Sequence, residues 1–314
     1  MNLVETPFVR LPGAAALAAE PWALPRWWAD AQLLLKPRIS LMVLLTVAVG
    51  FLIEASSPIP WLPLVHALLG TAAVATAANI LNQVLERDSD ARMERTRQRP
   101  VAAGRMSAAS ATWLGMLTGA AGLAYLAVTA NPLTVAVAAV TLASYVLIYT
   151  PLKRHTAWNT VVGAVPGALP PLIGCAAATG TLTLGGGALF LILFLWQFPH
   201  FWAIAWMYRA DYARGGLVML PNVDRSEGRL TGRLMFKTAL WLLLVSLLPT
   251  MFGTAGPIYL VGTVLAGLAF VAATASFWMR PAQETARRTL HMSLIYLPVV
   301  LLLLLADGPL RWRM

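Results

Sequence analysis

The chain has 314 residues, of which 59% are hydrophobic and only 11% are charged, and its formal net charge is +10. A soluble domain of this length would carry about a quarter charged residues, so the composition excludes an ordinary soluble globular protein. A basic balance often indicates nucleic-acid binding, but the Lys and Arg residues here lie in connections between apolar blocks. Membrane topology explains them better, and we expect no nucleic-acid partner.

The apolar residues fall into blocks close to the ~20 residues that a helix needs to cross a hydrocarbon core of about 30 Å. Hydropathy predicts nine spans, approximately 37–55, 61–84, 107–129, 131–149, 157–178, 186–207, 233–253, 256–278 and 289–306. In the fifth, Pro166, Pro170 and Pro171 with Gly163 and Gly167 predict a kinked helix that neighbours approach closely. We therefore expect an all-α polytopic membrane protein with about nine transmembrane helices in one bundle.

The ends of the chain differ from this pattern. Residues 1–35 contain Trp27 and Trp28 and predict an N-terminal tail with a short interfacial helix anchored by aromatic rings. Residues 36–306 form the predicted transmembrane domain, and 307–314 a C-terminal tail.

Lys and Arg residues are concentrated on alternate connections. They lie in the N-terminal region and after the second, fourth, sixth and eighth spans, whereas the connections near 56–60, 130–132, 179–185 and 254–256 carry none. Only Arg311 and Arg313 depart from this alternation. Since positive charge is retained on the cytoplasmic side, we predict a cytoplasmic N-terminus and an outer C-terminus.

Acidic side chains cluster after the second span, where topology does not require them. Asn82, Glu86 and Asp90 are spaced four residues apart and would share one helix face. Oxygen ligands so arranged suit Mg²⁺, which takes a few carboxylates together with substrate phosphates. Simple solvation of a helix end is the alternative, but an amide inside a span is costly without a partner, which favours a metal site.

Basic residues follow these acids directly. Arg95 and Arg99 would share a face if the segment is helical, and guanidinium groups bind phosphate oxygens in pairs. Carboxylates, a divalent cation and arginines together predict a diphosphate site. Lys153 and Arg154, after the fourth span, could add contacts, although positive-inside topology alone explains them equally well.

The sixth span carries a third candidate group. His200 lies within or near the end of this span, and an ionisable group there indicates function, although many single histidines only pack. Asp211 follows eleven residues later, about three helical turns on, so it would share the His200 face if the helix continued. A carboxylate that simply ends a helix is the alternative for Asp211.

Several strings resemble a known family. The spacing of Asn82, Glu86 and Asp90 resembles the first motif of the UbiA superfamily of intramembrane prenyltransferases. A longer ordered set resembles its haem O synthase branch, across about residues 36–300. It comprises Met93-x-Arg95-Thr96-x-x-Arg99-Pro100, Tyr149-Thr-x-x-Lys153-Arg154-x-Thr156, Asn159, Pro170-Pro171-Leu-Ile-Gly174, Trp196-Gln-x-Pro-His200-Phe and Asp211-Tyr212 with Met219-Leu220-Pro221.

Two positions depart from the superfamily pattern. Glu86 stands where Asp is usual, which keeps the carboxylate but lengthens its reach. The superfamily also has a second Asp-x-x-x-Asp motif, and the resemblance implies that Asp211 is a further metal ligand. Here, however, Gly215 stands four residues after Asp211, so only one carboxylate of that motif is present. The coordination of a second metal ion is therefore left open.

The resemblance implies a Mg²⁺-dependent transfer of farnesyl from farnesyl diphosphate to a vinyl group of haem b, giving haem O for terminal oxidases. It implies catalytic roles for Asn82, Asp90, Arg95, Arg99 and His200, with His200 contacting haem or acting as a base. It further implies a cytoplasmic-membrane enzyme whose site faces the cytoplasm, beside a haem A synthase or oxidase assembly. A UbiA-type enzyme for aromatic quinone precursors and a secondary transporter are the alternatives.

Overall fold

The computed structural model describes residues 26–308, which form helices and no strand. In chain order the helices are α1 (Arg26–Leu35), α2 (Pro37–Glu54), α3 (Trp61–Arg92), α4 (Ala108–Thr129), α5 (Pro132–Ala143), the π-helix η1 (Ser144–Tyr149), α6 (Thr150–Leu152), α7 (Asn159–Ala168), α8 (Pro170–Thr179), α9 (Leu184–Met207), α10 (Arg209–Arg214), α11 (Leu220–Val223), α12 (Arg229–Val245), α13 (Leu248–Met251), α14 (Pro257–Met279) and α15 (Gln283–Ala306).

Nine helical stretches within residues 26–308 are long and apolar enough to cross a membrane. Six are the single helices α2, α3, α4, α9, α14 and α15, and three are composite: α5 through α6, α7 with α8, and α12 with α13. The predicted all-α architecture of about nine spans is confirmed. The main differences are at polar helix ends, where α3 continues to Arg92 and α15 begins at Gln283.

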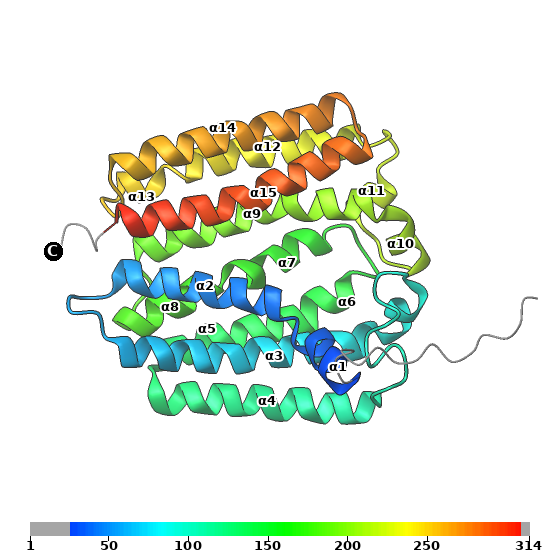
Figure 1. Cartoon of the computed structure of the whole chain (residues 1–314), viewed down its shortest axis with the longest axis horizontal. Coiled ribbons are helices and arrows are strands. Elements are labelled where there is room, and N and C mark those ends of the chain that lie inside the picture. The colour runs from blue at the N-terminus through cyan, green and yellow to red at the C-terminus, as the bar shows by residue number, and fades with distance from the viewer. Residues whose placement is uncertain (1–25, 309–314) are drawn as a thin grey trace, which may run out of the picture.

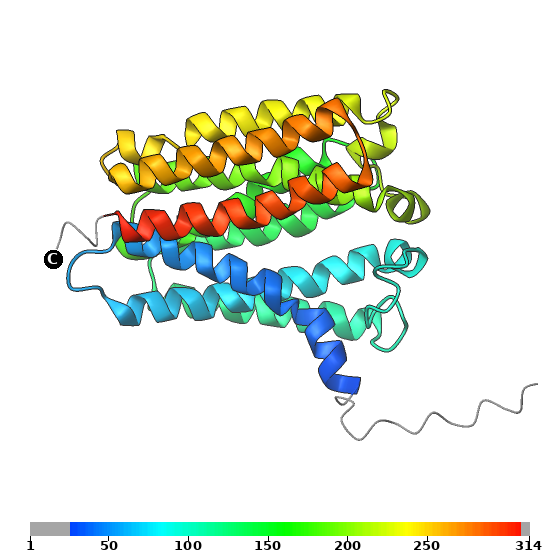
Figure 2. The same cartoon turned by 45° about the horizontal axis from the view of Figure 1, so that its top comes forward.

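The spanning helices lie roughly parallel in one bundle with two sides. Figure 1 shows α9, α12, α14 and α15 on one side and α3, α4 and α5 on the other, with α2, α7 and α8 between them. In Figure 2 the blue α2 lies against the red α15, which joins the two sides. Tyr259, Phe270 and Tyr296 belong to a buried cluster that joins α14, α15 and α9.

The fifth span bends and packs tightly, as the proline and glycine pattern predicts. It breaks at Leu169, between α7 and α8. A Cβ atom on Gly174 would lie 2.0 Å from the carbonyl oxygen of Val47, and one on Gly50 would lie 2.1 Å from that of Pro171. Only glycine permits this contact between the backbones of α2 and α8.

The fourth span widens into the π-helical turn η1 directly before α6. Pro151 lacks the N–H that would continue the α-helical ladder, and the hydroxyl of Thr150 donates instead to the carbonyl of Tyr145 (2.8 Å). Such turns reset which side chains face inward. Here Tyr145 and Tyr149, both in η1, line one cavity together with residues of α3.

The helix α1, the loop after α3, and α10 with α11 gather at one end of the bundle, opposite the end of α15 (Figure 1). The side chains of Asn79 and Gln83 on α3 donate to the carbonyls of Leu35 and Leu33, fixing α1 against α3. The N-terminal tail before Arg26, the last six residues and the basic exceptions Arg311 and Arg313 lie outside the described residues. An interfacial position for α1 stays a prediction.

Candidate active site

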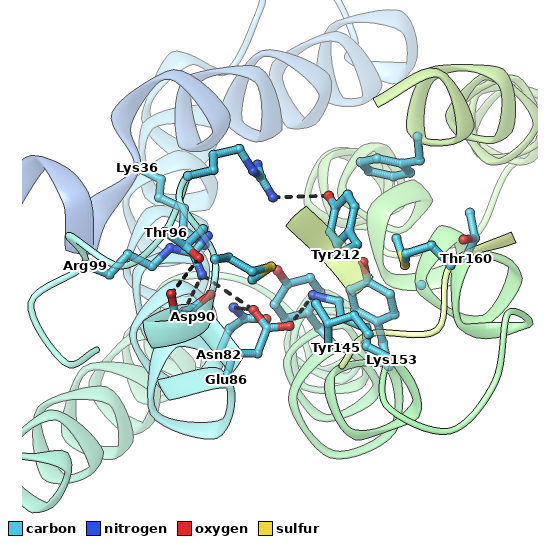
Figure 3. A pocket seen from close by; sticks show the side chains of 17 residues that line it. Lys36, Asn82, Glu86, Asp90, Thr96, Arg99, Tyr145, Lys153, Thr160 and Tyr212 are labelled. Carbon is cyan, nitrogen blue, oxygen red and sulfur yellow. Dashed lines mark hydrogen bonds and ion pairs between the residues drawn. The ribbon is translucent and has the colours of Figure 1, made fainter. Parts of the chain in front are cut away.

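One face of α3 forms the floor of a cavity at this end of the bundle. Because α3 is helical to Arg92, the side chains of Asn82, Glu86 and Asp90 lie one turn apart on the same face, as their spacing predicts. All three are buried and line a cavity of about 140 Å³ (Figure 3). The predicted candidates on α3 are thus brought together.

The remaining walls come from distant parts of the chain. Besides the α3 face, the lining residues are Lys36, Met93, Arg95, Thr96, Arg99, Tyr145, Tyr149, Lys153, Thr160, Gly163, Phe201, Tyr212, Leu217 and Met219. Cations gather around the carboxylates, while aromatic and aliphatic groups come from η1, α9 and the segment after α10. One cavity therefore combines a charged floor with apolar walls, an arrangement suited to an amphiphilic ligand.

Arg99 and Lys153 neutralise the two carboxylates of the floor. Arg99 Nη1 lies 2.6 Å from Asp90 Oδ2 and 3.5 Å from Glu86 Oε2, while Lys153 Nζ lies 2.6 Å from Glu86 Oε1. Burial opposes the charge of Lys153, but the adjacent Glu86 carboxylate dominates and raises the pKa of that ammonium group above its usual range. Both cations are therefore fixed and charged beside the acids.

Asn82 is oriented by hydrogen bonds on both sides of its amide. Its Nδ2 donates to Glu86 Oε2 (2.8 Å), and its Oδ1 accepts a hydrogen bond from the hydroxyl of Thr150 (3.1 Å). The costly amide noted in the sequence thus has partners within the site. This arrangement turns the Asn82 oxygen toward α6 rather than toward Asp90.

The floor fits a divalent cation of the Mg²⁺ kind. Within residues 26–308 no group of three or more His, Cys, Asp and Glu side chains is arranged to hold a metal ion. Mg²⁺, however, is usually held by one or two carboxylates and completed by water and substrate phosphates. Asp90 Oδ1 is buried without a hydrogen-bond partner, and so offers an unused ligand atom beside Glu86.

Lys36 is a cavity residue that the sequence interpretation assigned only to topology. It joins α1 to α2 in the left-handed backbone region, with φ 46°, and its side chain reaches the cavity. Burial and the nearby guanidinium of Arg99 lower the pKa of Lys36 to about 7. No hydrogen bond to its ammonium group is formed within the described part of the chain, so an anion entering the cavity would find a cation there without a partner.

Arg95 lines the cavity and is held by two tyrosines. Its Nη2 donates to the hydroxyl of Tyr212 (3.1 Å), and its guanidinium carbon lies 5.5 Å from the ring centroids of both Tyr208 and Tyr212. Such cation–π contacts orient the group while leaving other N–H donors available. Arg95 therefore projects from the rim as a positioned donor.

Arg154 does not line the cavity. Its Nη2 donates to the carbonyl of Leu85, 3.0 Å away, in the C-terminal part of α3. The adjacent Lys153 takes the cavity position instead. A diphosphate contact by Arg154 stays a prediction, and the observed bond is one that braces α3 against the loop after α6.

Asp211 also lies outside the cavity lining. Its carboxylate accepts from the backbone N–H groups of Glu94 (2.7 Å) and Arg95 (3.2 Å) and from Arg214 (2.7 Å). Burial favours the neutral acid, but these donors hold the pKa of Asp211 below its usual range. Asp211 thus fixes the loop that carries Arg95, and metal binding by Asp211 stays a prediction.

The missing second carboxylate has a structural counterpart. A Cβ atom on Gly215 would lie 2.8 Å from Cγ of Met93, and the carbonyl of Gly215 accepts from Arg92 (3.0 Å). Met93 is buried and itself lines the cavity. The position that holds an acid in the superfamily motif is therefore filled here by packing of the loop after α3.

His200 lies beside the cavity rather than on its wall. Its ring stacks on Trp196 at 4.6 Å and meets the ring of Phe201 edge-on at 5.4 Å, and Phe201 lines the cavity. Nδ1 lies 2.8 Å from the hydroxyl of Ser293. His200 therefore contacts a residue of the cavity wall without lining the cavity itself.

Several cavity residues were missed by the sequence interpretation. Tyr145 read as an ordinary aromatic residue of an apolar span, because a π-helical turn cannot be seen in the pattern. Tyr149 and Phe201 stood within the quoted motifs but were given no role of their own. Lys36 had a usable signal, since the following Pro37 marks a helix start and hence a turn in the chain. The polar floor, in contrast, was marked by charge within a helix.

Comparison with known proteins places the chain in a family. The UbiA prenyltransferase family model matches residues 43–295, which include the whole cavity except Lys36. The chain belongs to the UbiA prenyltransferase family. UbiA membership makes it a multi-pass membrane enzyme that transfers prenyl groups, and the secondary-transporter alternative falls away.

Curated relatives within the UbiA family cover nearly all of the chain. A protoheme IX farnesyltransferase from Salinibacter ruber is 46% identical over 278 residues, covering 88% of this chain and 98% of the relative. Another, from Solibacter usitatus, is 42% identical over 285 residues, covering 88% and 97%. The resemblance to the haem O synthase branch is thereby confirmed.

Solved UbiA structures share the fold at low identity. A digeranylgeranylglyceryl phosphate synthase superposes with a TM-score of 0.76 at 17% identity, covering 90% of this chain and 99% of its own. A UbiA homologue from Archaeoglobus fulgidus, bound to DMAPP and Mg²⁺, superposes with a TM-score of 0.66 at 16% identity, covering 86% and 99%. These likenesses confirm the UbiA fold.

Proposed function

We propose that this chain transfers a farnesyl group from farnesyl diphosphate to a vinyl group of haem b, producing haem O. The observation that carries the proposal is a sequence identity of 42% and 46% to two protoheme IX farnesyltransferases, in alignments that cover 88% of this chain. The cavity supports it with a charged floor for the diphosphate and apolar walls for the prenyl chain.

The diphosphate would lie over the α3 face. Arg95 and Arg99 would donate to its oxygens, joined by Lys153 and Lys36 from the opposite walls, and these cations would offset the charge that grows on the leaving group. Three of these cations are positioned before substrate binds: Arg95 by Tyr212, Arg99 by Asp90 and Lys153 by Glu86. Prepositioned charge of this kind lowers the barrier to breaking the allylic C–O bond.

Mg²⁺ is the cofactor that this floor would hold. Asp90 and Glu86 would supply carboxylate oxygens. Asn82 would supply its amide oxygen only after turning it away from the hydroxyl of Thr150, and Asp211 is retained as a more distant candidate. When bound, the cation would act as a Lewis acid on the diphosphate oxygens. Asp90 Oδ1, buried and without a partner, is the ligand atom that this chain most clearly leaves open.

The acceptor would approach from the apolar side, where His200 contacts Phe201 of the cavity wall. The vinyl carbon forms a bond to C1 of the farnesyl group as the diphosphate departs. Water then adds to the resulting cation and loses a proton, which completes the hydroxyethyl group. We assign His200 to haem, as an iron ligand or as the base that receives this proton, on the strength of its ring position beside the cavity.

The same proposal covers location and partners. The alternating Lys and Arg pattern supports a cytoplasmic membrane enzyme whose cavity end and N-terminus face the cytoplasm. Residues 36–306 would form the catalytic domain, α1 an interfacial element and 307–314 a short outer tail. A haem A synthase or terminal oxidase assembly would receive the product.

Membranes containing the chain, incubated with haem b, farnesyl diphosphate and Mg²⁺, test the proposal. We expect a product with the mass of haem O, and we expect Asp90→Ala to abolish it. A mass shift on an aromatic quinone precursor, with haem b left unchanged, would instead support the alternative acceptor. Retained activity in Asp90→Ala would refute the metal assignment.

A further inference from the structure

Ser293 on α15 contacts both members of the aromatic pair that contains His200. Its hydroxyl lies 2.8 Å from Nδ1 of His200, and its backbone carbonyl accepts from the indole N–H of Trp196 at 2.8 Å. Trp196 in turn stacks on the imidazole ring with an interplanar angle of 23°. Ser293 therefore contacts the imidazole ring of His200 directly and also fixes the indole ring of Trp196 on which that imidazole stacks.

The position of the hydroxyl hydrogen decides the direction of the Ser293–His200 bond. Ser293 Oγ lies only 2.6 Å from the carbonyl oxygen of Leu290, and two oxygens this close require a hydrogen between them. A serine hydroxyl has one hydrogen, so Oγ is left as an acceptor toward His200. Nδ1 must then carry the proton that it donates to Oγ.

The environment keeps this arrangement intact. Ser293 is fully buried, so bulk water does not compete for its hydroxyl. With Nδ1 protonated, the neutral ring has its lone pair on Nε2, and no residue within 26–308 bonds to that atom. An imidazole nitrogen with a free lone pair is a ready ligand for iron, and the hydrogen bond at the other nitrogen normally determines which one is available.

We propose that Ser293 is a positioning residue that fixes His200 in the Nδ1–H form and so leaves its Nε2 lone pair free to bind the iron of the acceptor haem. This inference rests on the proposed function, because it presupposes that haem b is the acceptor. It adds a residue on α15, 93 positions along the chain from His200. The residues that line the cavity all lie between Lys36 and Met219.

The first test reads the tautomer in the unmodified protein. The chain has four histidines, so ¹⁵N-histidine labelling gives few signals, and the one lost in His200→Ala belongs to His200. We expect the ¹⁵N shifts of a neutral ring protonated at Nδ1. A ring protonated at Nε2 would overturn the proposal without any effect on the proposed function.

The second test titrates haem b into the purified full chain and follows its absorption and spin state. We expect Ser293→Ala to bind haem about 10-fold more weakly with an altered spectrum, as is usual for loss of a residue that orients a metal ligand, while Mg²⁺-dependent binding of farnesyl diphosphate stays unchanged. Ser293→Thr, which keeps the hydroxyl, should restore the wild-type spectrum. An Ser293→Ala protein with the wild-type haem spectrum and affinity would contradict the proposal.

The two levels of the account fail separately. If the wild-type chain converts haem b but the spectrum is indifferent to Ser293, the positioning role is wrong and the proposed function stands. If the wild-type chain neither binds nor converts haem b, the proposed function is wrong and the role assigned to Ser293 falls with it.

Discussion

Lys153 and Glu86, 67 positions apart in the chain, meet with Nζ 2.6 Å from Oε1 and join the end of α6 to α3. Both side chains are largely buried, at 12% and 6% exposure. A pair in such surroundings is costly to break from one side, because the remaining charge then lies buried without its partner. The contact therefore links the integrity of the bundle to the chemistry of the cavity.

Replacing Lys153 should separate these two roles. We expect Lys153→Met to destabilise the protein by about 3–5 kcal/mol and to suppress prenyl transfer. The double variant Lys153→Met with Glu86→Gln removes both charges, and should recover much of the stability without recovering activity. Thermal unfolding in detergent and product mass measure the two effects. Full activity in the double variant would show that neither group serves the reaction.

Lys36 offers a substitution in which strain and charge act in opposite directions. Its φ of 46° is a conformation that glycine adopts at little cost. We expect Lys36→Gly to keep or slightly raise the unfolding temperature, but to raise the KM for farnesyl diphosphate about 10-fold, as expected for loss of a charge-assisted contact. Lys36→Arg, which keeps the charge, is the control. An unchanged KM in Lys36→Gly would remove Lys36 from the substrate site.

Restoring the superfamily carboxylate at position 215 should not improve this enzyme. A side chain there would collide with Met93, 2.8 Å from the first added carbon. We expect Gly215→Asp to displace the loop that carries Arg95 and to lower activity at least 10-fold, a loss of about 1.4 kcal/mol in transition-state binding. Adding Met93→Ala should recover part of the loss. Higher activity in Gly215→Asp alone would mean that the loop tolerates a second acid.

The crossing of α2 and α8 predicts a sharp contrast between two glycines. Alanine at Gly174 would place its Cβ 2.0 Å from a backbone oxygen, whereas alanine at Gly187 on α9 would meet nothing within 4 Å. We expect Gly174→Ala to cost at least ~1–3 kcal/mol of stability, and Gly187→Ala to be neutral or slightly stabilising. Equal unfolding temperatures for the two variants would refute the close packing.

Asp224 gives the fold a pH dependence at the start of α12. Its carboxylate accepts from the backbone N–H groups of Ser226 (2.9 Å) and Thr231 (2.8 Å). Partial burial opposes ionisation, but these bonds and those from both hydroxyls lower the pKa of Asp224 below its usual range. A lowered native pKa stabilises the fold above the unfolded-state pKa, and this contribution is lost as pH falls through the native value.

The stability difference between wild type and Asp224→Asn should follow that sign. We expect the wild type to unfold at a higher temperature near pH ~7, and the gap to close below about pH 4 as the native carboxylate takes up its proton. Unfolding midpoints across this range measure the gap. A difference that widens on acidification would show that Asp224 is not ionised in the native protein.

The spans and the acidic floor could be predicted because each has a local cause. A helix that crosses a membrane needs about 20 apolar residues, and side chains four apart share a helix face. Glu86 and Asp90 therefore had to meet wherever α3 stayed helical, which it does to Arg92. A polar amide within an apolar span also pointed to Asn82 before any packing was known.

The rest depended on tertiary contacts that no local pattern encodes. Lys153 and Arg154 are neighbours of equal charge, yet one reaches Glu86 and the other a backbone carbonyl on α3. The helix that carries His200 did not continue as expected: α9 ends at Met207, and Asp211 lies in the separate helix α10. Its carboxylate accepts from backbone N–H groups of a loop more than 100 positions earlier. Which way each side chain turns was decided by the docking of α3 against α10 and η1.

A competition between two acceptors in one reaction distinguishes a haem farnesyltransferase from an enzyme that prenylates aromatic quinone precursors. Purified full-length protein in detergent receives farnesyl diphosphate and Mg²⁺ together with equal concentrations of haem b and an aromatic hydroxybenzoic acid, and both product masses are measured. We predict that haem O forms with release of diphosphate and that the aromatic acid stays unmodified. A prenylated aromatic acid with unmodified haem b would contradict it.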